Sequence, residues 1–247
     1  MVKEGMPPAK SKRPLVVMKF GGTSVGNAER MQNVGNLLAE HAQHAELAVV
    51  VSAMGGVTDM LIRAATEASA GDGEHWKNVR RELAHRHREV ADQLLSAAEQ
   101  AFVLPRLAAQ VGNFENLCSG FSLVREVTPR AMDTLSSLGE VMSANLMAAI
   151  LRSLGIAAEA VDATELIVTD DNFGNASPRF EETLSKHVSA WRRSVAGELF
   201  PLLPASGART GRASARRWAV ADRTSAARSS GRRWMPMRSG SGPTWTG

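Results

Sequence analysis

The chain has 247 residues, of which 44% are apolar, enough to bury the core of one large domain or two small ones. One cysteine, Cys118, excludes an internal disulfide framework, and no apolar run approaches the length of a membrane span. The net charge of +4 is unevenly divided: residues 201–247 carry +8, whereas residues 1–200 carry −4. Nucleic-acid binding would therefore depend on the last segment alone.

The amino-terminal segment is polar and basic. Residues 1–14 contain no apolar stretch of the kind found in secretory signal peptides, and we expect them to form a disordered arm. The absence of such a signal and the single cysteine together favour a cytoplasmic protein. Cys118 is expected to be a small buried apolar residue rather than a catalytic thiol.

The most informative segment is Lys19–Gly26, with the sequence KFGGTSVG. It follows an apolar run, Leu15–Phe20, that predicts a buried strand, and it precedes Asn27–His44, where apolar residues recur at helical spacing. Glycines let backbone N–H groups approach an anion, a helix amino terminus adds partial positive charge, and Lys19 supplies a cation. The segment is therefore predicted to hold phosphate groups, with a tight turn that binds nothing as the alternative.

A second strand and helix follow in the same order. Leu47–Ser52 predicts another buried strand, the pair Gly55-Gly56 comes after it, and Thr58–Ala70 has helical spacing up to a break at Gly71. Strands that alternate with helices predict an α/β fold with a mainly parallel sheet between helices. Ligands bind such sheets beyond the carboxyl ends of the strands, where both glycine pairs lie.

Long helices are expected next. Trp76–Phe102 and Leu107–Leu117 are helical in pattern, and the first is rich in charged residues that predict a solvated face. His85 and His87 are assigned to that face, and they point in different directions, which makes them poor joint metal ligands. The remaining expected elements are a helix over Thr134–Leu154 ended by Gly155, strands at Ile156–Val161 and Leu166–Thr169, a loop over Asn172–Ser177, a helix over Pro178–Ala196 and a strand at Leu199–Leu203.

Lys19–Gly26 resembles the amino-terminal signature of the aspartate kinases, within the amino acid kinase family. Two further segments resemble the same family in order and spacing: Val49–Asp59, which reads VVVSAMGGVTD, and Leu138–Ser143, which reads LGEVMS. The resemblance covers residues 15–203, which we interpret as the amino-terminal part of an amino acid kinase domain.

The resemblance implies a reaction and roles for particular residues. The reaction is the transfer of the γ-phosphoryl group of ATP, with Mg²⁺, to the side-chain carboxylate of L-aspartate, a first step towards lysine, threonine and methionine. Lys19 would be the catalytic lysine, and Glu140 would pair with the substrate ammonium. The residues implied in ATP binding are Lys19, Gly21, Gly22, Thr23 and Ser24. Those implied in substrate binding are Ser52, Thr58 and Glu140.

Several alternatives stay open. From the residues alone, Thr58 is equally well explained as the N-cap of the following helix. For Glu140, the residues alone favour a solvated helix residue, and only the family resemblance favours substrate binding. The enzyme alternative is another amino acid kinase, such as a glutamate kinase, and a different class is a non-catalytic nucleotide-binding remnant. We expect the intact family member to be a homo-oligomer, and we expect no nucleic-acid partner, no membrane association and no metal site made of protein side chains.

The composition changes at residue 204. Arginine, serine, glycine and tryptophan dominate residues 204–247, and the GRGGSD-like and TDVDG-like loops that the family resemblance implies there are not found in the sequence. A functional arginine-rich arm that binds nucleic acid is one explanation. The other is that this segment is translated out of frame and is disordered, which would leave the chain inactive as written.

The genetic code supports the second explanation. Suppose that the true reading frame is shifted, so that each true codon consists of the last base of one printed codon and the first two bases of the next. Tryptophan has a single codon, TGG, so the shifted codon across Trp218 and Ala219 must be GGC, which encodes glycine. The shifted codon across Trp245 and Thr246 must be GAC, which encodes aspartate. Permitted codons elsewhere let Arg216–Thr224 read TTLGRGGSD and Met235–Gly247 read DADEVWIWTDVDG. The forced residues fall where the family pattern needs them, and we therefore expect a frameshift near Leu199.

Overall fold

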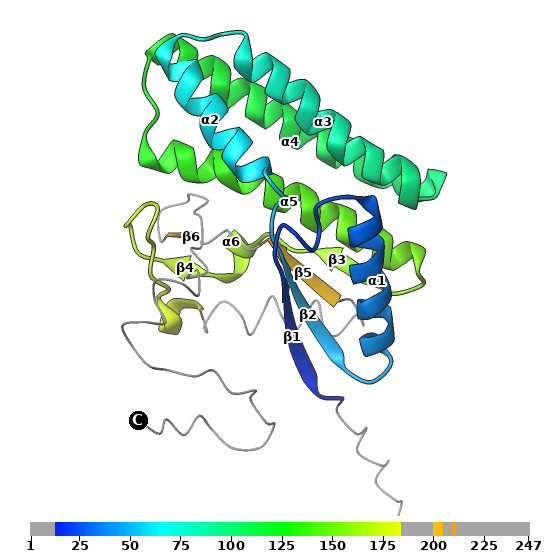
Figure 1. The fold of residues 1–247 in the computed structure, drawn as a ribbon. Helices are drawn as coiled ribbons and strands as arrows, with labels where there is room; N and C mark the ends of the chain where they lie inside the picture. Colours follow the sequence, from blue (N-terminus) through cyan, green and yellow to red (C-terminus); the bar gives the residue numbers. More distant parts are fainter. Residues whose placement is uncertain (1–12, 184–199, 205–208, 211–247) are drawn as a thin grey trace, which may run out of the picture.

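The computed structural model describes residues 13–183, 200–204 and 209–210 (Figure 1). Nearly all of the predicted arm over residues 1–14, most of the predicted helix over 178–196 and most of the segment 204–247 lie outside the described residues. Within the described part, residues 180–183 are helical, at the start of that predicted helix.

A four-stranded parallel sheet with the strand order β1-β2-β5-β3 lies beneath the helices. Its strands are β1 (Leu15–Phe20), β2 (Glu46–Val51), β3 (Ala158–Ala160) and β5 (Phe200–Pro204). In the register of β1 with β2, Lys19 lies opposite Val50, one residue from the carboxyl end of each strand. A second, two-stranded parallel sheet joins β4 (Val168–Thr169) to β6 (Arg209–Thr210). The predicted α/β fold with a parallel sheet is confirmed.

Two helices pack on the four-stranded sheet. α1 (Ala28–Ala42) contacts β2, and α5 (Pro129–Ser153) contacts β2, β3 and β5. The two helices also contact each other, and at Gly35 they lie so close that a Cβ atom would be 2.8 Å from Cγ2 of Ile150. The buried stripe of α1, which includes Met31, Val34 and Leu38, explains the helical spacing seen in the sequence.

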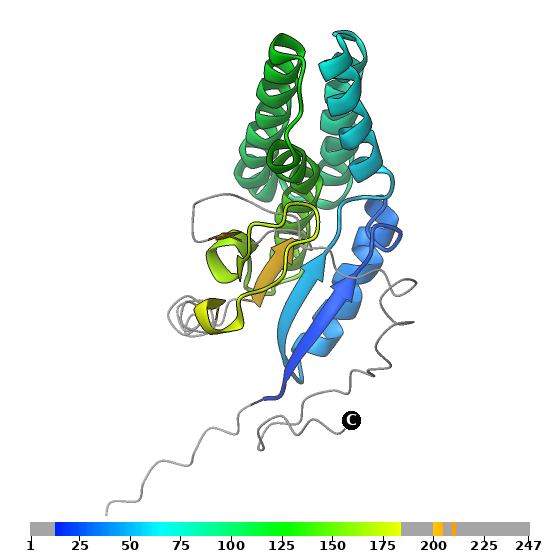
Figure 2. The same cartoon turned by 90° about the vertical axis from the view of Figure 1, so that its left-hand side faces the viewer.

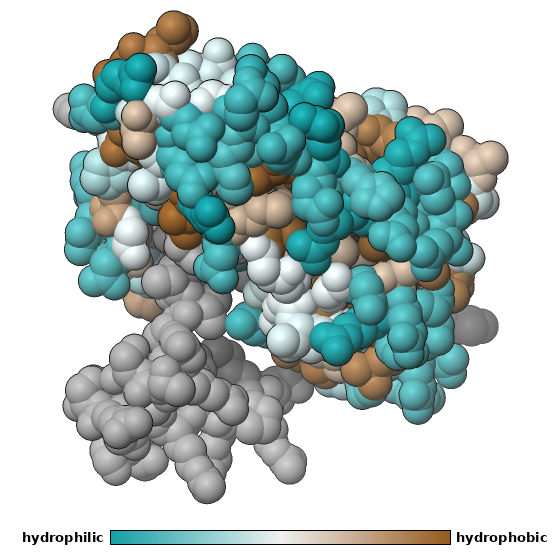
Figure 3. Space-filling view, turned by 45° about the horizontal axis from the view of Figure 1, so that its top comes forward, coloured by the Kyte–Doolittle hydropathy of each residue, from teal (hydrophilic) through white to brown (hydrophobic). Residues whose placement is uncertain are grey.

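Three of the remaining described helices form a lobe beyond the carboxyl ends of β1 and β2 (Figures 1 and 2), whereas the short helix α6 (Ala163–Leu166) lies outside it, beside β4. α2 (Val57–Ala70), α3 (His75–Leu94) and α4 (Ala97–Val124) pack on one another and on α5, which runs through both the lobe and the sheet layer. The outer surface of the lobe is largely hydrophilic (Figure 3), as the charged pattern predicted. Among the described helices, only α5 is long and apolar enough to span a membrane, and 78% of its apolar window is buried inside the protein, as in the core helix of a soluble protein.

Helix boundaries differ from the prediction where capping residues set them. The predicted helix Trp76–Phe102 is two helices, because Ser96 caps α4 by accepting a hydrogen bond from the backbone N–H of Glu99. This Ser-x-x-Glu spacing is a capping-box pattern that the hydrophobic periodicity obscures. α5 begins at Pro129, earlier than predicted, because Thr128 caps it and proline suits the first helical position.

His87 is buried, which corrects the prediction that it lies on a solvated face; His85 is exposed. Nδ1 of His87 lies 2.8 Å from the carbonyl oxygen of Leu83, and Nε2 has no hydrogen-bond partner among the described residues. Burial is the main cause that lowers the pKa of His87 from 6.5 to about 4, because the charged imidazolium loses its hydration. The side chain is therefore neutral at pH 7.

We expect the free energy of unfolding to fall as the pH drops from 6.5 towards 4, by up to about 3 kcal/mol. The unfolded chain binds a proton on His87 in this range, whereas the folded chain does not. Urea unfolding between pH 7.5 and 4.5 measures the effect. His87→Leu should reduce the pH dependence, and the matched control His85→Leu should leave it unchanged. An identical pH dependence in the His87→Leu and original chains would contradict the assignment.

Cys118 is 0% exposed, as the sequence predicted, and burial raises the pKa of its thiol to about 12. We expect a thiol-specific aromatic disulfide to label the folded chain only as fast as the chain opens, and to label it at once in denaturant. Absorbance of the released thiolate measures both rates. Prompt stoichiometric labelling in native buffer would contradict the burial of Cys118.

Candidate functional site

The first glycine loop makes a tight turn between β1 and α1. The backbone N–H of Ser24 donates to the carbonyl oxygen of Gly21 at 2.9 Å, and Nη1 of Arg30 donates to the carbonyl oxygen of Thr23 at 2.6 Å. Thr23 is exposed, and Lys19 is exposed at the end of β1. The hydrogen bonds inside the loop thus hold its backbone in one shape and leave the lysine in solvent.

The second glycine loop lies against the first. The backbone N–H of Ser52 donates to the carbonyl oxygen of Phe20 at 3.0 Å, which continues the β1–β2 pairing beyond the strands. A Cβ atom on Gly22 would lie 2.8 Å from the carbonyl oxygen of Ala53 and 3.5 Å from Cα of Gly55. The two loops are therefore in backbone contact, which only glycine permits at this distance.

Helix α5 meets the second loop through another glycine. A Cβ atom on Gly139 would lie 2.7 Å from Cγ1 of Val57 and 3.0 Å from Cβ of Ala53. This close approach brings Glu140, the next residue, to the second loop. Glu140 is half-buried, and its Oε2 is shielded from solvent, which differs from the solvated residue that the alternative described.

The amino terminus of α2 has open hydrogen-bond donors. Its N-cap is Gly56, at φ 79°, with no side-chain hydrogen bond, so the alternative that Thr58 is the N-cap is wrong. Among the described residues, no acceptor faces the backbone N–H of Gly55, Gly56 or Thr58. These donors lie beside the half-buried side chains of Ser52 and Thr58, and such a helix terminus attracts an anion.

The structure brings together the three segments that carry the predicted site residues. Lys19, Gly21, Gly22, Thr23 and Ser24 lie on or beside the first loop, Ser52 and Thr58 flank the second, and Glu140 follows the glycine of α5 that touches it. No cluster of three or more histidine, cysteine, aspartate or glutamate side chains that could hold a metal occurs among the described residues.

Sequence reasoning missed two supporting residues. Asp133, on α5 and 4% exposed, accepts a hydrogen bond at Oδ2 from the backbone N–H of Gly174, which attaches the loop after β4 to α5. Arg86, on α3, donates from Nη2 to the carbonyl oxygen of Gly55 at 2.9 Å. No local spacing signals either contact, because the partners are 41 and 31 residues apart in the chain.

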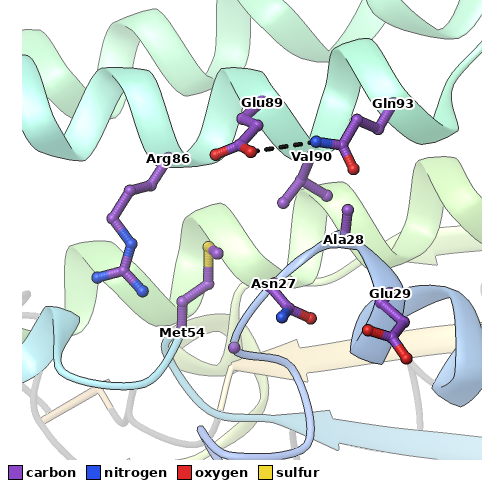
Figure 4. A pocket seen from close by; sticks show the side chains of 9 residues that line it. Asn27, Ala28, Glu29, Met54, Arg86, Glu89, Val90 and Gln93 are labelled. Atoms are coloured by element: carbon purple, nitrogen blue, oxygen red, sulfur yellow. Dashed lines mark hydrogen bonds between the residues drawn. The ribbon is translucent and has the colours of Figure 1, made fainter.

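A pocket of about 320 Å³ lies between the start of α1, the second loop and α3 (Figure 4). Arg86 extends from α3 down to the second loop, whereas Glu89 is hydrogen-bonded to Gln93 on the same helix. The other lining residues are Gly26, Asn27, Ala28, Glu29, Met54 and Val90. The pocket touches both glycine loops, since Gly26 belongs to the first and Met54 to the second.

Residues 14–209 match the amino acid kinase family. The chain belongs to this family. Aspartokinase 3, chloroplastic, from Arabidopsis thaliana is 36% identical over 166 residues, which are 67% of this chain and 29% of that protein. Bifunctional aspartokinase/homoserine dehydrogenase 1, chloroplastic, from the same plant is 31% identical over 176 residues, 71% of this chain and 19% of that protein. These relatives confirm the predicted resemblance to aspartate kinases.

Solved structures of amino acid kinases share the fold. The crystal structure of E. coli aspartokinase III in complex with aspartate and ADP superposes with a TM-score of 0.73 at 21% identity, over 83% of this chain and 43% of that chain. Its complex with lysine and aspartate gives 0.72, also at 21% identity, over 85% and 44%. The chain therefore spans less than half of these two structures and less than a third of the two plant relatives.

Replacing Gly139 with alanine should push α5 away from the second loop, because the added Cβ overlaps Val57 and Ala53. We expect Gly139→Ala to lower the free energy of unfolding by about 1–3 kcal/mol, measured by urea denaturation. The matched control is Gly112→Ala on α4, where a Cβ would meet nothing within 4 Å. This change should instead stabilise the chain by about 0.5–1 kcal/mol through helix propensity. Equal effects of the two substitutions would refute the close contact.

Proposed function

We propose that this chain is the amino-terminal part of an aspartate kinase, which transfers the γ-phosphoryl group of ATP to the side-chain carboxylate of L-aspartate. The observation that carries the proposal is the contact of both glycine loops and α5 at the carboxyl edge of the sheet. The relatives that are 31–36% identical to it, which are aspartokinases, support aspartate as the acceptor.

The acceptor needs no general base. An aspartate side chain with a pKa of about 3.9 is already ionised at neutral pH, and its oxygen is the nucleophile. The difficulty lies in bringing this anion against the phosphates of ATP, because the two repel each other. Lys19 supplies a positive charge at the end of β1, and the N–H groups of Gly21 and Gly22 face the phosphates, so that the growing charge is stabilised.

The amino acid is held by groups of opposite character. Glu140 pairs with its ammonium group, in a contact that gains strength because the carboxylate is half-buried. The hydroxyls of Ser52 and Thr58, with the open N–H groups at the amino terminus of α2, bind its negatively charged end. This arrangement selects a zwitterion that carries a further carboxylate.

The nucleotide rests on the first loop, where Thr23 and Ser24 add hydroxyl donors to the glycines. Magnesium is commonly held by one or two carboxylates together with substrate phosphates. Mg²⁺ would therefore bind together with the phosphates of ATP. We also propose a homo-oligomeric, cytoplasmic enzyme for the intact protein.

The proposal also explains why the composition changes in residues 204–247. We propose that the gene is shifted near Leu199, so that residues 204–247 do not carry the second phosphate loop that the reaction requires. Sequencing the gene tests this directly. We expect codons that spell TTLGRGGSD over Arg216–Thr224 in the shifted frame, and codons that cannot spell it would exclude the shift. Salt-dependent RNA or DNA binding lost on deletion after Leu203 would favour the arginine-rich arm instead.

The product of the gene with its frame restored should convert ATP and L-aspartate to an acyl phosphate, trapped as its hydroxamate by hydroxylamine. Lys19→Ala should lower the rate by at least about 100-fold, because one charge-stabilising group is lost. The matched control is Lys77→Ala, an exposed lysine on α3 that pairs with Glu74. If the enzyme phosphorylates glutamate or carbamate faster than aspartate, the assignment of aspartate as its substrate is wrong. The chain as written should show no turnover, and detectable activity would contradict the frameshift proposal.

A further inference from the structure

We propose that Arg86 is a positioning residue for the amino acid site. Its guanidinium fixes the Gly55–Gly56 peptide in the orientation that presents the N–H donors of α2 to the substrate. The inference rests on the proposed function, since it assigns a task to a residue outside the three motif segments.

Arg86 makes its polar contact with the second loop and with no other described group. The side chain is half-buried and reaches from α3 to the second loop (Figure 4), where Nη2 donates to the carbonyl oxygen of Gly55 at 2.9 Å. Among the described residues this is its one hydrogen bond, and no carboxylate lies within ion-pair distance. The neighbouring Arg88, in contrast, is exposed and pairs with Asp92 at 3.4 Å.

By fixing the carbonyl of Gly55, this hydrogen bond also fixes the direction of the N–H group of Gly56. No described peptide bond is cis, so the carbonyl of Gly55 and the N–H of Gly56 point in opposite directions. With the carbonyl held on Arg86, the N–H of Gly56 is directed away from α3. This N–H is one of the donors for which the described residues offer no acceptor.

A turn hydrogen bond from the N–H of Val57 to the carbonyl oxygen of Met54, at 2.9 Å, closes the loop but does not engage the Gly55–Gly56 peptide itself. Two consecutive glycines rotate their shared peptide at low cost, because neither has a Cβ atom to restrict φ and ψ. A half-turn would place the carbonyl oxygen where the N–H donor stands and would repel an anionic substrate. The first loop lies close to Gly55, since a Cβ on Gly55 would be in ordinary van der Waals contact with the carbonyl oxygen of Gly22, at 3.5 Å. Arg86 therefore supplies the hydrogen bond that fixes the carbonyl of Gly55.

The charge of Arg86 adds to its position. Hydrogen bonds from a guanidinium to a carbonyl are stronger than neutral ones, and they polarise the attached N–H group. A cation without a described carboxylate partner also raises the electrostatic potential at the amino terminus of α2, where a carboxylate is to bind.

The experiment uses the full-length product of the gene with its frame restored, labelled with ¹⁵N-glycine. It is prepared without substitution, which is the original chain of this comparison, and as Arg86→Ala, Arg86→Lys and the matched control Arg88→Ala. NMR spectra report the amide resonance of Gly56, and titration with L-aspartate gives the dissociation constant of each chain. Thermal unfolding shows that each variant is folded.

We expect Arg86→Ala to shift the Gly56 amide resonance and to weaken L-aspartate binding about tenfold, with little change in the unfolding midpoint. Arg86→Lys should recover part of the affinity, since lysine keeps the charge and a donor, and Arg88→Ala should match the original chain. An unmoved Gly56 resonance, or equal affinity in the original and Arg86→Ala chains, overturns the assignment of Arg86 alone. No binding of L-aspartate by the original chain would count against the proposed function, and with it against this inference.

Discussion

Backbone contact between two glycine loops and a helix is the constraint on which the rest of the site depends. Gly22 meets the carbonyl of Ala53, and Gly139 meets Ala53 and Val57, at distances that leave no room for a side chain. These contacts join segments that are far apart in the chain, and they place the ends of β1 and β2 beside the middle of α5. The positions of Lys19 and Glu140 follow from them.

The surrounding packing supports this contact from both sides. α5 carries a long run of buried residues, among them Leu138, Met142 and Leu146. The helix packs against β2, β3 and β5, which determines its position relative to the sheet. α1 reaches the same helix through Gly35. The lobe of α2, α3 and α4 closes the other end, and Arg86 extends from it to the second loop. A small set of close helix contacts thus determines where the loops lie.

The positions of β1 and β2, the first two helices and the three motif segments could be predicted from the sequence, because apolar periodicity and glycine pairs are local signals. The predicted burial of β1 is wrong, since its residues alternate between exposed and half-buried, and the predicted strand Leu166–Thr169 begins at the end of a short helix, Ala163–Leu166. Ser96 and Thr128 also act locally, but their capping patterns are short and were outweighed by the longer hydrophobic pattern. The burial of His87 and the contact of Arg86 with Gly55 could not be predicted, since both depend on how α3 folds back onto earlier parts of the chain. Charge in the sequence indicated a solvated helix, and tertiary packing decided otherwise at these positions.

The order of strands has a consequence for how the chain is made. β5 lies between β2 and β3 in the sheet but is the last of the four to be synthesised. While the ribosome translates the residues before Phe200, the facing edges of β2 and β3 have no partner and are open to wrong pairing. The insertion of β5 is thus a late, long-range folding step.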